Sequence, residues 1–431
     1  MIMEGALERD VQSGDWRMTH AVTSLDLPDS LQSLLLARID RLDLPERQVL
    51  QRASVIGAVF WLDVLRVLLD HGEIDAAALR SHLTALQRTQ FIQERGQAAP
   101  LGMEYAFNST LIREAAYESL LRARRVAYHR QIAAHFEDRF GDEVPMKYNC
   151  LLAHHYHQAG DVHNELRYTL RAAEHAQEIY ANIEAVRRYT DALAILRRLR
   201  EAAPDAEQRR QWQVQIFAVL GHRRAVYELL GRRDEMRNDA QSLLTLARQL
   251  EERPLLIDAL LQQPAVRLSF EDPRAAIPMA KKALTLARQL EDRHREMQAL
   301  LALSDQQLYL NDPTWQTTGE EALALARELG DRQHEAQILI QLGKFCSWTD
   351  KPEQGMAYFQ EAMEVTHVLD DKLTEVALLD QLGLDAEREG DYYRLLTEYH
   401  QKRLRLSREI AYRDGEISSL TMCGQTQSVY L

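Results

Sequence analysis

The sequence predicts an all-α fold, a right-handed α-solenoid of helical hairpins that follows a small domain of helices and strands. A segment at 243–253 returns at 283–293 and 322–332, with fainter copies at 362–372 and 403–413. The last residues of these copies lie 40, 39, 40 and 41 positions apart. A fixed period of about 40 is typical of solenoids, in which each repeat packs only on its neighbours.

Each repeat is predicted to contain a first helix, a short turn, a second helix and a charged turn. The recurring segment belongs to the second helix, and its apolar stripe is Ala283, Leu284, Leu286, Ala287 and Leu290 in the second copy. Asp or Pro marks the start of that helix, because Asp caps free N–H groups and Pro suits a first turn. The marking residues are Asp234, Pro273, Pro313, Pro352 and Asp391.

Glycines and prolines predict how the helices pack. Gly343 and Gly383 follow a Leu at the same place in successive first helices, where a small residue lets a partner helix approach closely. Pro264 and Pro278 fall inside predicted helices of one repeat, and each is expected to bend or break its helix.

Composition and charge narrow the class of protein. The 431 residues carry a net charge of −13, which argues against a sequence-independent nucleic-acid binder, whose affinity comes from Lys and Arg at phosphates. Cys150, Cys346 and Cys423 show no paired spacing, so neither a disulfide framework nor a zinc site is expected. The longest apolar run, at 55–62, is far shorter than the ~20 residues of a membrane span. No signal-peptide pattern opens the sequence, and we expect a cytoplasmic protein.

Four regions are expected along the chain. The first is a β-hairpin or remnant that leads from an upstream domain, with a turn signal at 13–15. The second contains several helices and then a strand–turn–strand segment, the pattern of a winged-helix domain over about 44–110. Connecting helices come next, and then the solenoid, which is expected to be truncated because 415–431 lacks a second helix to cover it. The four regions are 1–26, 27–110, 111–145 and 146–431.

The repeat resembles the tetratricopeptide class of helix–turn–helix units. The residues similar to the packing positions of that class are Leu342, Gly343, Ala357, Phe359 and Ala362. The period of about 40 is longer than the period of about 34 that is usual for the class. Longer repeats of this kind are common in the sensor regions of bacterial signalling proteins.

Three further stretches together resemble the part of bacterial signal-transduction ATPases of the AAA/STAND type that follows the nucleotide-binding domain. They are 27–42 with 50–60, 107–121, and 153–161 with 180–185. Such proteins occur as cyclase-linked or LuxR-type regulators, and the resemblance implies an ATPase core with ATP and magnesium upstream. No G-x-x-x-x-G-K-[ST] phosphate loop occurs here, because Gly343-Lys344 is followed by Phe345. We therefore expect a segment of a longer protein without its ATPase core.

The densest histidine cluster could bind a metal or could simply pack. It consists of His154, His155, His157 and His163, with Asp161 nearby. A metal site needs three or four converging ligands, and the spacing alone does not supply them. The sequence therefore favours a packing and surface role.

Basic and aromatic side chains also have two interpretations each. One group of basic residues could contact DNA or could form a solvated helix face, and the solvated face is favoured. This group consists of Arg122, Arg124, Arg125, His129 and Arg130. Arg38 and Arg41 could reach a nucleotide on an upstream domain or form an intrahelical charge pattern, and both interpretations stay open. One group of aromatic residues could line a ligand groove or could pack in the core, and core packing is favoured. This group consists of Trp212, Trp315, Trp348, Tyr392 and Tyr393.

The sequence thus predicts a non-catalytic regulatory and protein-interaction module, which senses a protein or small effector in the groove of its superhelix. No catalytic, cofactor-binding or metal-binding residue is assigned, and binding to membranes or nucleic acid is not expected. Two alternatives stay open. One is a DNA-binding transcriptional regulator that uses the winged helix. The other is a fragment of an ATPase or nucleotide cyclase whose catalytic domain lies upstream.

Overall fold

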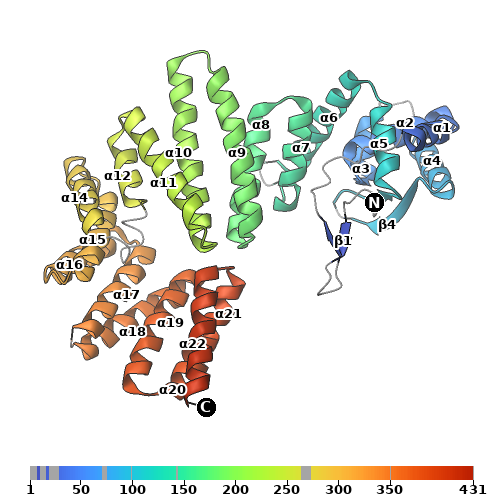
Figure 1. Cartoon of the computed structure of the whole chain (residues 1–431). Coiled ribbons are helices and arrows are strands. Elements are labelled where there is room, and N and C mark those ends of the chain that lie inside the picture. The colour runs from blue at the N-terminus through green and yellow to red at the C-terminus, as the bar shows by residue number, and fades with distance from the viewer. Residues whose placement is uncertain are drawn as a thin grey trace. The chain divides into compact units, whose positions relative to one another are not determined.

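The computed structural model describes residues 7–9, 16–18, 29–69, 75–98, 100–141, 144–263, 273–349 and 351–430. The chain divides into two compact units, Met1–Asp161 and Val162–Leu431. Figure 1 shows helices in nearly every part of both units.

The first unit combines helices with short strands. Strands β1 (Leu7–Arg9) and β2 (Trp16–Met18) pair antiparallel. The elements that follow are α1 (Asp29–Asp40), α2 (Leu44–Ile56), β3 (Val59–Trp61), α3 (Leu62–Leu68), α4 (Ala76–Arg88), β4 (Ile92–Gln97) and β5 (Met103–Phe107). The last three strands form an antiparallel sheet in the order β3-β5-β4. Its core contains Phe60, which is fully buried and stacks on Tyr105 with ring centroids 5.5 Å apart.

Three helices complete this unit. They are α5 (Thr110–Glu118), α6 (Arg122–Phe140) and α7 (Asn149–Ala159), with a 3-10 turn at Met146–Tyr148. Helix α7 packs on α6. Phe136 of α6 is fully buried and meets Tyr148 at a ring-centroid distance of 5.1 Å, so the 3-10 turn fixes the start of α7 on the apolar face of α6.

The second unit is a solenoid of tetratricopeptide-like helix pairs, as the period predicts. Each helix packs on the next one in the chain (Figure 1). Its helices are α8 (Val162–Glu178), α9 (Asn182–Ala202), α10 (Ala206–Leu229), α11 (Arg233–Leu250), α12 (Arg253–Leu261), α14 (Pro273–Gln289), α15 (Arg293–Tyr309), α16 (Trp315–Leu329), α17 (Arg332–Trp348), α18 (Pro352–Leu369), α19 (Lys372–Glu389), α20 (Tyr392–Arg394), a π-helix at Leu395–His400, α21 (Gln401–Glu409) and α22 (Arg413–Tyr430).

The recurring segment ends where each first helix begins. Its last residues are the first residues of α12, α15, α17, α19 and α22. The acidic residue just before caps the helix: Asp292 and Asp331 accept backbone N–H groups at 3.0 and 3.1 Å. The predicted starts of the second helices also hold at Pro273 and Pro352, whereas α16 begins two residues after Pro313.

The Arg of the recurring segment ties successive helices together. Arg288 contacts Glu296 at 2.7 Å and Glu321 at 2.6 Å. One repeat later, Arg327 makes the same pair of contacts with Glu335, at 3.0 Å, and with Glu361. Glu296 and Glu335 are almost fully buried at the starts of α15 and α17. The Leu-Ala-Arg motif therefore recurs because its apolar residues fill the core while its Arg neutralises a buried carboxylate.

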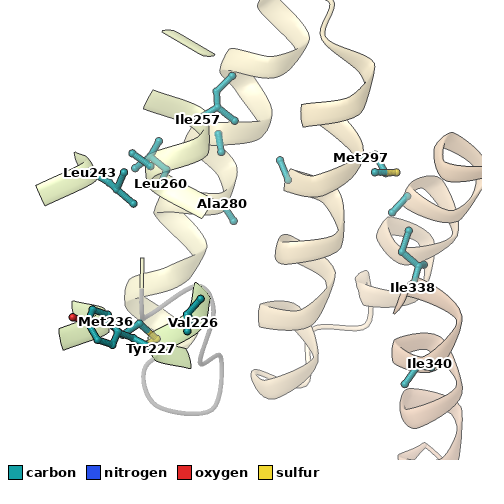
Figure 2. Close-up of a cluster of buried hydrophobic side chains, with 14 of the residues drawn as sticks. Val226, Tyr227, Met236, Leu243, Ile257, Leu260, Ala280, Met297, Ile338 and Ile340 are labelled. Carbon is teal, nitrogen blue, oxygen red and sulfur yellow. The ribbon is translucent and has the colours of Figure 1, made fainter. Parts of the chain in front are cut away.

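One apolar core runs through the second unit, from Leu166 to Ile410. Figure 2 shows side chains from several successive helices in it, among them Leu243, Ile257, Met297 and Ile338. The predicted stripe is buried at Ala283, Leu284 and Ala287, whereas Leu290 is 37% exposed at the end of its helix. Pro278 lies inside α14, and Pro264 lies outside the described residues.

The predicted close approach at glycine is found at Gly343 and not at Gly383. A Cβ on Gly343 would lie 2.5 Å from the Phe359 ring, which is itself 1% exposed. A Cβ on Gly355 would lie 2.9 Å from the Gly343 carbonyl oxygen, so α17 and α18 meet at two glycines. At Gly383 the nearest atom would be at 3.4 Å, an ordinary contact.

The second unit brings its first and last hairpins into contact. Asn182, at the start of α9, donates a hydrogen bond from Nδ2 to the Ile410 carbonyl at 3.2 Å, although 228 positions separate the two residues. Asn182 is only 2% exposed. Arg233 lies 3.9 Å from Asp414 in the same region. The superhelix therefore curves far enough for its two ends to meet.

Candidate ligand groove

The first helices of successive repeats line one groove in the second unit. Its volume is about 920 Å³. Side chains of α10, α12, α15, α17 and α19 form its wall, and Arg403 and Tyr412 also line it. These helices are the first helices of successive repeats, and the contact of Asn182 with Ile410 shows that the stack of repeats is curved. The groove is therefore a consequence of the superhelical curvature, and no single repeat contains it.

Side-chain amides are the most frequent polar groups of the groove. They belong to Gln262, Gln298, Gln333, Gln337, Gln341 and Gln381. Three of them, at 333, 337 and 341, share one face of α17, because residues four apart lie one above the other on a helix. Within the described residues no hydrogen bond engages the side chains of these three glutamines, and each is at least partly exposed.

Charged groups of the groove are paired with other protein groups. Asp258 receives two hydrogen bonds from Arg295, at 2.7 and 2.8 Å. The carboxylate of Asp380 lies 2.6 Å from Arg403, whose side chain is 7% exposed. Lys344 donates to the Tyr309 hydroxyl at 2.8 Å and lies over the Trp348 ring. The charges are thus largely neutralised locally, whereas the α17 amides are available to a ligand.

The aromatic residues considered from the sequence do not line this groove. Trp315 is 6% exposed and stacks on Phe345 with ring centroids 4.1 Å apart, so it is a core residue. Trp348 meets Tyr309 edge-on, and Trp212 packs against the core beside His163. Tyr393 is 79% exposed. The aromatic side chains that do line the groove are Phe217 and Tyr412, which the sequence did not single out.

The residues of the predicted histidine cluster do not form one site: His154, His155 and His157 belong to the first unit and His163 to the second. His155 is fully buried and its Nδ1 lies 2.8 Å from Nδ1 of His129, a residue that is 1% exposed. The Tyr117 hydroxyl lies 3.0 Å from Nε2 of His129. Burial, and then the charge of His154, lowers the pKa of His129 to about 3. This buried pair joins α6 to α7 as neutral rings, so packing accounts for both histidines.

The basic residues considered from the sequence have contacts within the first unit. Arg125 lies over the Tyr117 ring and donates to the Leu120 carbonyl at 2.9 Å. Arg38 lies over the Phe91 ring, and it also donates to the Thr89 carbonyl. Arg122, Arg124 and Arg130 are exposed on α6.

One cluster of metal-ligating residue types was missed in the sequence. In the described ranges the only group of three or more His, Cys, Asp or Glu side chains with ligand atoms within 4.8 Å is His294, Asp331 and His334. His334 and Gln298 also line the groove. Because the two histidines lie one whole repeat apart in the sequence, they come together only when neighbouring repeats stack.

Two further sequence features have structural outcomes. Cys150 is an exposed free cysteine and Cys346 a buried one, and the side chain of Cys423 lies outside the described residues. Among the helices that the structure describes, none is both long and apolar enough to cross a membrane.

The chain is similar to several solved protein structures at low sequence identity. The sequence matches no family model and no curated protein. A signal transduction ATPase with numerous domains and a tetratricopeptide repeat sensor, from Pyrococcus horikoshii, is similar in structure, with 13% identity and a TM-score of 0.49. The similarity covers 94% of this chain but 56% of that protein, so the present chain spans little more than half of its length.

Two bacterial proteins of known structure are also similar. Aspartyl phosphate phosphatase F of Bacillus subtilis shares 12% identity over 90% of this chain and 96% of its own, with a TM-score of 0.47. The quorum sensor NprR of B. thuringiensis shares 15% identity over 78% and 93%, with a TM-score of 0.35. Identities this low concern the fold alone. The class defined by the helix pairs and the groove is that of tetratricopeptide-like helical repeat proteins.

Proposed function

We propose that this chain is a non-catalytic protein-interaction module whose groove binds a partner's segment in an extended conformation. The observation that carries the proposal is the row of Gln333, Gln337 and Gln341 along α17. A side-chain amide offers both a donor and an acceptor, the two groups that an extended backbone presents.

The spacing of the row suits an extended chain. Residues four apart on a helix are separated by about 6 Å along its axis. Residues two apart on an extended chain are separated by about 6.4–6.8 Å, and their N–H and C=O groups point the same way. Each amide of the row therefore faces alternate residues of a segment that runs along α17. Such recognition depends on the backbone and tolerates many side chains.

The proposal also includes a regulatory role within a larger signalling protein. The order α2, β3, α3, α4, β4, β5 supports a winged-helix domain over about 44–110. We infer from the sequence resemblance that the parent is a signalling ATPase in the cytoplasm, in which the groove senses the effector. In that case ATP and magnesium bind to the ATPase core of the parent, upstream of this chain, and not to the groove. The alternatives are a DNA-binding regulator and an ATPase or cyclase fragment.

Selection from a library of random twelve-residue peptides tests the groove. The full chain should enrich peptides, and changing all three α17 glutamines to Ala should weaken each by about tenfold or more, since three hydrogen bonds of about 0.5–1.5 kcal/mol are lost. Ala favours helix, so α17 should persist. Gln360→Ala, on the exposed side of α18, is the matched control and should change nothing. Unchanged affinity in the triple variant would exclude the amide row, and salt-sensitive binding of duplex DNA by the full chain would favour the DNA-binding alternative.

A further inference from the structure

Two histidines from neighbouring repeats face each other at the wall of the groove. His294 is the second residue of α15 and His334 the third residue of α17. Their ring centroids are 5.4 Å apart and the rings are nearly perpendicular, at 87°. His334 is half-buried and His294 is exposed, so both side chains are accessible from solvent.

One carboxylate orients both rings. Oδ2 of Asp331 lies 2.9 Å from Nδ1 of His334 and 3.5 Å from Nδ1 of His294. The other carboxylate oxygen, Oδ1, accepts the backbone N–H of His334 at 3.1 Å, so the cap of α17 fixes the carboxylate in place. A charged carboxylate at Nδ1 keeps the N–H on that nitrogen and makes Nε2 a more basic lone-pair donor.

The Nε2 atoms of both histidines lie close to the same side-chain amide. Nε2 of Gln298 lies 3.2 Å from Nε2 of His294 and 3.4 Å from Nε2 of His334. In this arrangement the amide NH₂ of Gln298 donates to the Nε2 lone pair of each ring. A flip of the amide would place its oxygen beside both Nε2 atoms, so that two imidazole nitrogens and an amide oxygen face one small space.

We propose that His294 and His334 bind a first-row transition-metal ion such as Zn²⁺, with Gln298 as a third ligand and Asp331 as the group that orients the rings. Imidazole suits zinc, copper and nickel, and a carboxylate behind a ligating histidine is the usual second partner of such sites. Zn–N bonds of about 2.0–2.1 Å require the side chains to adjust around the ion, and the exposed His294 has the room to do so.

The site would open onto the groove. Zinc takes four ligands, and three protein ligands leave one position for water or for a group on a bound segment. Because His334 and Gln298 line the groove, that position faces the ligand space. The metal site does not depend on the proposed peptide binding, since Zn²⁺ alone is the probe.

Isothermal titration of the full chain with Zn²⁺ tests the site. One equivalent should bind, and His294→Ala or His334→Ala should each weaken that binding by about tenfold or more. His367→Ala is the matched control, because His367 is an exposed histidine of α18 that lies outside the groove. No binding to the wild-type chain, or binding that survives both substitutions, overturns the proposal.

Gln298→Glu provides a second test of the zinc site, which remains informative if the Ala variants fold poorly. A carboxylate is a stronger zinc ligand than an amide, so this variant should bind Zn²⁺ more tightly than the wild-type chain does. If Gln298 only donates hydrogen bonds to the histidines and is not a ligand, the same substitution should not raise the affinity for Zn²⁺. Zinc affinity that is unchanged or lower in this variant would contradict the proposed role of Gln298 as a ligand.

Discussion

At the scale of single residues, two glycines decide how closely α17 and α18 approach. A methyl group at Gly343 would lie 2.5–3.0 Å from three carbons of the Phe359 ring, which is buried and cannot swing away. The sequence predicted this contact from the Leu-Gly pair. The similar pair at Gly383 has no such contact, because there the partner helix begins with a short α20 and a π-helix.

Gly343→Ala should therefore destabilise the chain by about 2 kcal/mol. Overpacking of a rigid core site costs about 3 kcal/mol, and the better helix propensity of Ala returns about 1 kcal/mol. Gly221→Ala is the matched control, because its nearest neighbour would lie at 3.4 Å. Thermal unfolding should show a lower Tm for Gly343→Ala and an equal or higher Tm for Gly221→Ala. Equal shifts in both variants would show that the Gly343 contact is unimportant.

At the scale of elements, the recurring segment predicted the second helices and the charged turn that follows each of them. This was possible because its signals are local: an apolar stripe, and an acidic and a basic residue after it. The structure adds that the last residue of each copy is the first residue of a first helix. The Arg contacts of the same segment could not be predicted, since Glu321 and Glu361 belong to the next repeat. Which Leu of the stripe stays exposed, as Leu290 does, also depends on the neighbouring helices.

The joint between α6 and α7 should be sensitive to pH. The pKa of His129 lies at about 3 in the folded chain, and burial lowers that of His155 well below 6.5 as well. The unfolded chain therefore binds more protons below pH 6.5, and the stability of this joint is lost as the pH falls from 6.5 towards 3. The slope approaches a limit of about 1.4 kcal/mol per pH unit for each histidine.

Hydrogen exchange of the α6 and α7 amides at pH 7 and pH 5 measures that loss. The free energy of opening should fall at pH 5 in the wild-type chain and should fall less in His129→Gln, which has no proton to gain. His157→Gln, at an exposed position of α7, should show the same decrease in the free energy of opening as the wild-type chain. If His129→Gln shows the same pH dependence as the wild-type chain, the buried pair does not set it.

At the scale of the whole molecule, curvature determines the groove, and curvature was not evident in the sequence. The period predicts that repeats stack, but the contact of Asn182 with Ile410 shows how far the stack turns. The polar residues of the groove are mostly Gln, Asp and Arg, which are common on any helix surface. The sequence instead singled out large aromatic residues, and those fill the core or lie elsewhere on the surface. The metal-ligand cluster was missed for the same reason, since His294 and His334 are one repeat apart.

The most direct test of backbone recognition is an N-methyl scan of a peptide selected by the full chain. Methylation removes one backbone N–H at a time and leaves every side chain in place. Affinity should fall by roughly 2- to 10-fold at alternate positions along the stretch beside α17, the cost of one hydrogen bond of about 0.5–1.5 kcal/mol, and should change little between them. An even profile, or losses that follow only particular side chains, would contradict recognition of an extended backbone by the glutamine row.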